Sequence, residues 1–100
     1  MTKSRVEILN DLGNIRFYYS HKSNLDSCDL LSSFLPIVSL YDNLMRECQN
    51  LKLIDLYKSL YHDNNSLTSL SILWDYSTKH LSRLHNALIN YIEKKLHEED

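Results

Sequence analysis

Apolar residues recur at helical spacing along most of the chain, and short polar runs separate the helical stretches. Over residues 4–21 the apolar positions keep helical spacing; they are Val6, Ile8, Leu9, Leu12, Ile15, Tyr18 and Tyr19. Ser4 and Glu7 form the Ser-x-x-Glu capping box that is typical of a helix start. The pattern therefore predicts a first helix over residues 4–21.

Gly13 falls in the middle of this first predicted helix. Glycine inside a helix costs about 1 kcal/mol relative to alanine. It is either an accident without structural consequence or a point where a neighbouring helix comes close. Because the chain holds one glycine and one alanine, we expect its helices to stand well apart everywhere except near Gly13.

A second amphipathic stretch begins near Asp26 or Ser27, either of which can cap a helix, and its apolar face extends to Cys48. Pro36 interrupts it. Because proline inside a helix removes a backbone hydrogen bond and clashes with the preceding turn, we expect a kink or a break there. A third apolar stretch over residues 51–61 either continues the second or starts anew with Asn50 as its cap. The pattern leaves open whether residues 28–62 form one, two or three helices.

Residues 63–66, Asp-Asn-Asn-Ser, give the clearest loop signal, and the longest predicted helix follows them over residues 67–96. Its apolar positions alternate steps of three and four, as in the heptad seam of a coiled coil. We expect this seam to pack within the chain; alternatively, the Leu67–Tyr91 seam pairs with its copy in a homodimer. Its members are Leu67, Leu70, Trp74, Ser77, Leu81, Leu84, Leu88 and Tyr91.

These stretches predict an all-α fold, in which residues 1–100 form a single helical domain with a frayed tail at about 97–100. We expect a compact bundle of three to five helices, with a long C-terminal amphipathic helix and a break or kink near Pro36. Two i,i+4 ion pairs, Asp42–Arg46 and Asp75–Lys79, fit the predicted helices.

Composition narrows the class of protein further. One glycine and one proline exclude glycine-rich phosphate loops and make a β-meander improbable. With a net charge of −2, the chain lacks the basic excess of a nucleic-acid binder, and no stretch is apolar enough for a membrane span. No apolar run of a signal peptide follows Met1, so we expect a cytoplasmic protein. The scarcity of Ala, Gly and Arg beside abundant Asn, Lys and Tyr is typical of AT-rich genes, which favours a bacterial or phage origin.

The chain contains residue types that can bind metals or catalyse reactions, but their spacing does not suit either role. His80 and His85 are five apart, so they diverge by about 140° around a helix and cannot share a metal ion. We expect Cys28 and Cys48 to be reduced, buried thiols. The acidic pairs Glu7/Asp11 and Asp26/Asp29 are expected to be helix-start or solvent-facing charges. We therefore predict no catalytic residues, no metal ligands and no cofactor.

The remaining signal is apolar surface on the last predicted helix. If the seam faces the core, Ile72, Tyr76 and Ile89 fall on outer positions, and Leu73 and His80 flank the seam. Ile72, Tyr76 and His80 are spaced i, i+4 and i+8, so they form one line along a helix. Either this helix is buried on all sides, or the line contacts a partner.

The second interpretation predicts a small, non-enzymatic protein-binding module of the inhibitor, immunity or adaptor type. Its predicted partner-binding residues are Ile72, Leu73, Tyr76 and His80. Tyrosine suits such a surface, because it buries a large area and keeps a polar tip. The alternative is a dimeric helical regulator of nucleic-acid transactions.

Overall fold

The computed structural model describes residues 3–21 and 33–98, which form five helices and no strand. This confirms the predicted all-α fold and its long C-terminal helix. The predicted caps Asp26 and Ser27, the acidic residue Asp29, the thiol of Cys28 and the end of the frayed tail lie outside the described residues. The elements are α1 (Arg5–His21), α3 (Leu35–Arg46), α4 (Leu51–Tyr57) with a π-helical turn η1 (Lys58–His62), α5 (Leu67–Trp74) and α6 (Thr78–Glu98).

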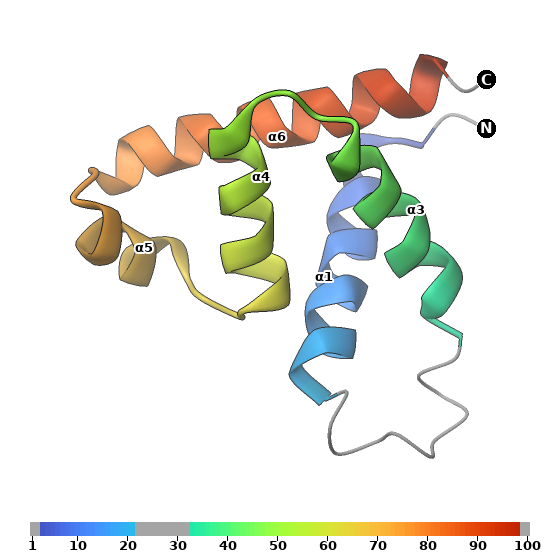
Figure 1. Ribbon diagram of the computed structural model, residues 1–100, viewed down its shortest axis with the longest axis horizontal. Helices are drawn as coiled ribbons and strands as arrows, with labels where there is room; N and C mark the ends of the chain where they lie inside the picture. The colour runs from blue at the N-terminus through green and yellow to red at the C-terminus, as the bar shows by residue number, and fades with distance from the viewer. Residues whose placement is uncertain (1–2, 22–32, 99–100) are drawn as a thin grey trace.

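The C-terminal helix α6 connects the other elements. Figure 1 shows it lying across one end of α1, α3 and α4, while α5 folds back against its first half. α1 also packs against α3 and against η1. The core therefore lies where these helices meet, and every described helix supplies buried apolar side chains to it. They include Ile8, Leu12, Ile15, Tyr41, Leu44, Leu56, Tyr57, Leu60, Leu70, Leu81, Leu88, Ile89 and Ile92.

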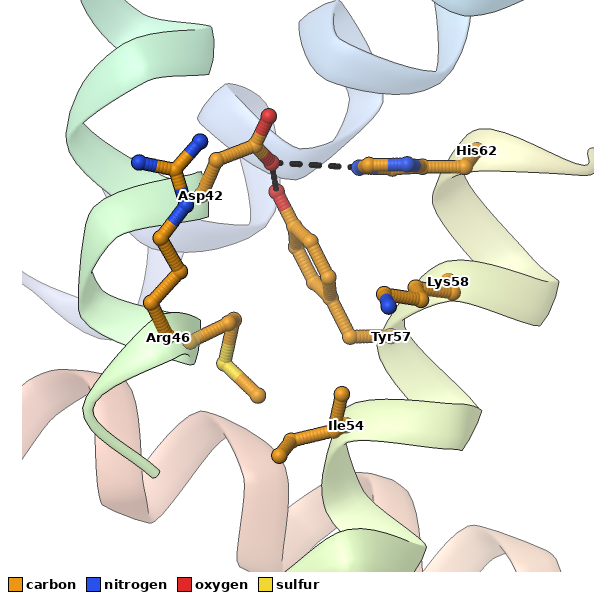
Figure 2. A pocket seen from close by; sticks show the side chains of 7 residues that line it. Asp42, Arg46, Ile54, Tyr57, Lys58 and His62 are labelled. Atoms are coloured by element: carbon orange, nitrogen blue, oxygen red, sulfur yellow. Dashed lines mark hydrogen bonds and ion pairs between the residues drawn. The ribbon is translucent and has the colours of Figure 1, made fainter. Parts of the chain in front are cut away.

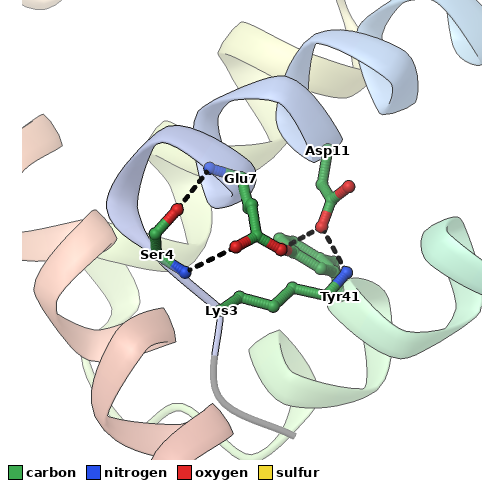
Figure 3. A network of polar contacts seen from close by, with 5 residues as sticks. All are labelled: Lys3, Ser4, Glu7, Asp11 and Tyr41. Atoms are coloured by element: carbon green, nitrogen blue, oxygen red, sulfur yellow. Dashed lines mark hydrogen bonds and ion pairs between the residues drawn. The ribbon is translucent and has the colours of Figure 1, made fainter.

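The start of α1 is fixed by the predicted capping box and by a polar network behind it (Figure 3). The Ser4 hydroxyl accepts a hydrogen bond from the Glu7 amide at 3.2 Å, and the Glu7 carboxylate accepts one from the Ser4 amide at 3.3 Å. Asp11 accepts from the Tyr41 hydroxyl at 2.7 Å and from the Lys3 ammonium at 2.6 Å. The expected solvent-facing role is therefore wrong for Asp11, which links α1 to α3 with its side chain only 14% exposed.

Gly13 does not mark a close helix contact. No atom outside its own stretch of α1 lies within 4 Å of the position that a Cβ would take, and the residue is exposed. The expectation of a neighbouring helix at this point is wrong, because Gly13 lies on the solvent side of α1 while Leu12 and Ile15 face the core.

The break expected at Pro36 is a helix start. α3 begins at Leu35, so Pro36 lies in the first turn, where the missing amide N–H has no helical acceptor to lose. The Asn50 side chain caps α4 by accepting hydrogen bonds from the amides of Lys52 and Leu53 at 3.0 and 3.3 Å. The second and third apolar stretches are therefore separate helices. Residues 63–66 form the predicted loop.

The prediction of one helix over residues 67–96 is wrong, because residues 75–77 interrupt it. Asp75 adopts the left-handed conformation with φ 57° and ψ 42°, which ends α5. The Ser77 hydroxyl accepts a hydrogen bond from the His80 amide at 3.1 Å and so caps the start of α6. The position that looked like the one polar member of the heptad seam is therefore a helix cap.

This break changes the faces predicted for the C-terminal residues. The helical spacing from Asp75 to Lys79 is lost, so the predicted ion pair between them does not form. Ile89, predicted to lie on the outside, is 1% exposed and packs in the core with Leu88 and Ile92. The predicted continuous seam does not exist, although its members Leu70, Leu81 and Leu88 are buried within the chain. Dimer formation stays a prediction. Within the ranges described above, no helix has the length and apolar character needed to cross a membrane.

The open space around Gly13 yields a stability prediction. Gly13→Ala should raise the free energy of unfolding by about 1 kcal/mol, because alanine loses less backbone entropy in a helix and its methyl group meets nothing. Urea denaturation followed by circular dichroism measures this. Leu12→Ala, at the neighbouring buried position, is the control and should lower the stability by about 2–5 kcal/mol. A loss of stability in Gly13→Ala would contradict the open environment.

Candidate functional site

The predicted partner-binding residues lie around the turn between α5 and α6. Ile72 and Leu73, consecutive in α5, are 78% and 69% exposed, and Ile72 is the most exposed large hydrophobic side chain in the described ranges. Both residues are therefore on the surface, as the partner-binding interpretation requires.

Tyr76 and His80 belong to the same region but not to the same helix as Ile72. Tyr76 lies in the break and is half-buried, and His80 is exposed in the first turn of α6. Their rings meet edge to face, with centroids 4.8 Å apart. The single line of Ile72, Tyr76 and His80 along one helix is therefore wrong, because the left-handed residue Asp75 separates α5 from α6.

The aromatic rings of this region are supported from α4. The Lys52 ammonium lies 5.2 Å from the Trp74 ring centroid and 5.0 Å from that of Tyr76, a cation–π arrangement. Trp74 and Tyr76 also contact each other edge to face. We call the surface formed by Ile72, Leu73, Trp74, Tyr76 and His80 the α5–α6 corner.

The structure also contains a pocket that the sequence did not indicate. It is open to solvent, has a volume of about 380 Å³ and lies between α3 on one side and α4 with η1 on the other (Figure 2). Its lining combines apolar, cationic and hydrogen-bonding side chains. They are Asp42, Met45, Arg46, Ile54, Tyr57, Lys58 and His62.

Asp42 is the best-connected polar residue of this pocket. Its Oδ1 accepts hydrogen bonds from the Tyr57 hydroxyl at 2.7 Å and from His62 Nε2 at 3.1 Å. Its Oδ2 accepts one from the Tyr19 hydroxyl at 2.8 Å. The His62 ring also stacks on the Tyr19 ring, with centroids 3.9 Å apart. One carboxylate therefore joins α1, α3, α4 and η1.

These contacts replace the ion pair predicted between Asp42 and Arg46. The Arg46 guanidinium donates instead to the Asn43 side chain at 3.1 Å, within its own helix. The pairing predicted from helical spacing is therefore wrong, because three donors from other elements already surround the carboxylate of Asp42.

The hydrogen bonds decide the protonation of this cluster. Burial alone would raise the pKa of Asp42, but the hydrogen bonds from His62, Tyr57 and Tyr19 outweigh it and lower the pKa below its ordinary value. Burial and the bond to Asp42 raise the pKa of Tyr57, which keeps it a neutral donor. Asp42 is thus an ionised, weakly basic carboxylate with its oxygens engaged. Such a carboxylate is better suited to holding the helices together than to accepting a proton as a general base.

The position of His62 depends on the π-helical turn. Arg16 of α1 donates hydrogen bonds to the carbonyl oxygens of Leu60 and Asn65, both at 3.0 Å, and so satisfies backbone acceptors in and just after η1. The Tyr61 hydroxyl meets His85 Nε2 on the inner side, where burial lowers the pKa of His85 and favours the neutral imidazole that accepts this bond. α1 and α6 therefore hold η1 from two directions.

Neither region offers a metal centre. Across residues 3–21 and 33–98, no group of three or more His, Cys, Asp or Glu side chains lies close enough to hold a metal ion. The Cys48 thiol is buried and free, as predicted, and donates to the carbonyl oxygen of Asn50 at 3.7 Å.

Sequence patterns indicated the α5–α6 corner in part and the pocket not at all. They named Ile72 and Leu73 as candidate partner-binding residues, left open whether the helix was buried on all sides, and placed Tyr76 on the wrong element. The Asp42 cluster joins residues 15 to 23 positions apart, and no local spacing signals such contacts. Comparison of the chain with protein-family models, curated proteins and solved structures found no match. The functional argument therefore rests on the residues and their geometry.

The Asp42 cluster predicts a pH-dependent stability. Asp42→Asn should lower the free energy of unfolding by about 1–3 kcal/mol at pH 7, because buried donors lose a charged acceptor. Since folding lowers the pKa of Asp42, its stabilisation is fully present above the unfolded value near 3.9 and is lost as the pH falls through the lowered pKa. The deficit of the variant should therefore shrink as the pH falls below about 4.

Urea denaturation across this pH series measures the deficit. Asp55→Asn is the matched control, because Asp55 is exposed on α4 and its carboxylate has no bonding partner among the described residues. A deficit that does not change with pH, or an equal one in the control, would show that the charge of Asp42 does not stabilise the fold.

Proposed function

We propose that this chain is a small, non-enzymatic protein-binding module that docks the α5–α6 corner onto a protein partner. The observation that carries the proposal is the exposure of two adjacent aliphatic side chains, Ile72 and Leu73, at 78% and 69%. Removing such a side chain from water contributes about 1.5–3 kcal/mol. Burial of these side chains against a partner would supply this free energy to the complex, whereas in the isolated chain they stay in water.

The surroundings of these two residues suit an interface. Trp74 and Tyr76 lie beside them, and both residue types are enriched among those that dominate binding energies. Their rings are already fixed by each other and by Lys52, so little side-chain entropy is lost on binding. The corner thus combines an exposed aliphatic centre with ordered aromatic neighbours.

The charges near the corner suggest the chemistry of the partner. Lys79 and Arg83 follow the turn, whereas the exposed Asp75 lies in the turn itself. Lys52 adds a third cation next to the aromatic rings. Asp55 and Asp63 line a hollow together with Lys52 and Trp74, so a protein surface with an apolar centre and flanking charges of both signs would complement this arrangement. An inhibitor, an immunity protein or an adaptor of bacterial or phage origin would use such a surface in the same way.

The double substitution Ile72→Asp with Leu73→Asp should weaken partner binding at least tenfold and change the stability of the free protein by about 0.5 kcal/mol or less. Both side chains are already in water, so the folded state loses little, whereas the interface would have to bury two carboxylates. The partner is first captured from the native host and identified by mass spectrometry. Its dissociation constants with the wild type and the variants are then measured by calorimetry.

Val6→Asp is the control, because Val6 is a comparably exposed aliphatic residue, at 67%, on α1. Equal binding by the double variant and the wild type would contradict the proposal, as would unfolding of the free double variant. A gel shift by DNA or RNA at low ionic strength, together with a dimer in sedimentation, would favour the nucleic-acid regulator instead.

A further inference from the structure

We infer that the pocket beside Asp42 binds a small organic anion with an apolar body, such as an aryl or alkyl carboxylate. This site lies between α3 and α4 with η1, so the inference is independent of docking at the α5–α6 corner. Three features of the pocket favour such a ligand: its charge, its lining and its rigidity.

The charge of the pocket favours an anion. Asp42 is the one acidic residue of the lining, and its oxygens already accept hydrogen bonds from Tyr19, Tyr57 and His62. The lining also includes two cations, Arg46 and Lys58, both exposed. Neither forms an ion pair with a carboxylate in the described part of the chain. An anion entering the pocket would therefore meet two cations and one carboxylate whose oxygens already accept hydrogen bonds, while Asp55 and Asp63 lie with Lys58 around a neighbouring hollow.

The two cations of the lining lie on opposite walls of the pocket. Figure 2 shows Arg46 on the α3 wall and Lys58 on the opposite wall, with the Tyr57 ring between them. The guanidinium offers paired N–H donors that match a carboxylate, and the ammonium adds a mobile point charge. The two cations therefore lie on opposite sides of the Tyr57 ring, and the Arg46 guanidinium also donates to Asn43.

The apolar lining determines what the anion carries. Met45 and Ile54 line the pocket together with the cations, and the Tyr57 ring supplies an aromatic surface. The volume of about 380 Å³ lies at the lower end of the range of ligand sites, so the ligand should be about as large as an amino acid or a short aryl acid. Inorganic anions would leave these apolar surfaces uncovered.

The walls are held in place before any ligand arrives. Asp42 of α3 is hydrogen-bonded to Tyr57 of α4 and to His62 of η1, so the same carboxylate connects both sides of the pocket. A preformed site loses little conformational entropy on binding. The Asp42 cluster therefore acts as a brace for the pocket.

The test titrates the full chain with 4-phenylbutyrate, and compares 4-phenylbutanamide, its uncharged analogue, and inorganic phosphate. Binding is followed by NMR shifts of the Met45 methyl group and by calorimetry at low ionic strength. We expect saturable binding of 4-phenylbutyrate that shifts the Met45 signal, with at least tenfold weaker binding of the amide and of phosphate.

Arg46→Gln and Lys58→Gln should each weaken 4-phenylbutyrate binding at least fivefold without changing the melting temperature, since both side chains are exposed. Arg83→Gln, which removes an exposed cation from α6, is the matched control and should bind like the wild type. Any of four results would overturn the inference: no Met45 shift at millimolar 4-phenylbutyrate, equal binding of the amide, equal binding of phosphate, or equal losses in all three variants.

Discussion

The left-handed backbone at Asp75 is the constraint on which the C-terminal half depends. A continuous helix over residues 67–96 would extend away from the bundle, whereas the turn at Asp75 folds α5 back against α6. Leu70 then reaches the core, and the Tyr76 ring contacts His80 and Lys52. Ile72 and Leu73 face outward because the opposite side of α5, a helix of eight residues, packs against α6. The exposed corner is thus a consequence of the break.

In the N-terminal part of the fold, the packing of α1, α3, α4 and η1 depends on Asp42. Its carboxylate collects donors from α1, α4 and η1, so three contacts between distant parts of the chain share one charge. The hydrogen bonds are strong enough to keep the carboxyl ionised despite its burial. The same contacts hold together the two walls of the pocket, which carry Arg46 and Lys58. Stability and the proposed anion site therefore depend on one residue.

Features that depend on residues close together in the chain could be predicted from the sequence. The capping box at Ser4, the loop over residues 63–66 and the apolar face of α1 all follow from neighbouring residues, and the Asn50 cap was one of two alternatives that the pattern left open. The break at residues 75–77 was missed because Ser77 fits both a seam and a helix cap, and because aspartate gives a weaker signal than glycine for a left-handed residue. The Asp42 cluster was missed for a different reason, since only tertiary packing brings its members together.

The most direct test of this account is the backbone conformation of residues 74–78 in solution. Cα and Cβ chemical shifts and the coupling constants that report φ distinguish the two arrangements residue by residue. The account predicts helical values over 67–74 and 78–98, separated by a positive φ at Asp75 and a capped start at Ser77. Uninterrupted helical values from 67 to 96 would contradict it, because one straight helix would remove the α5–α6 corner.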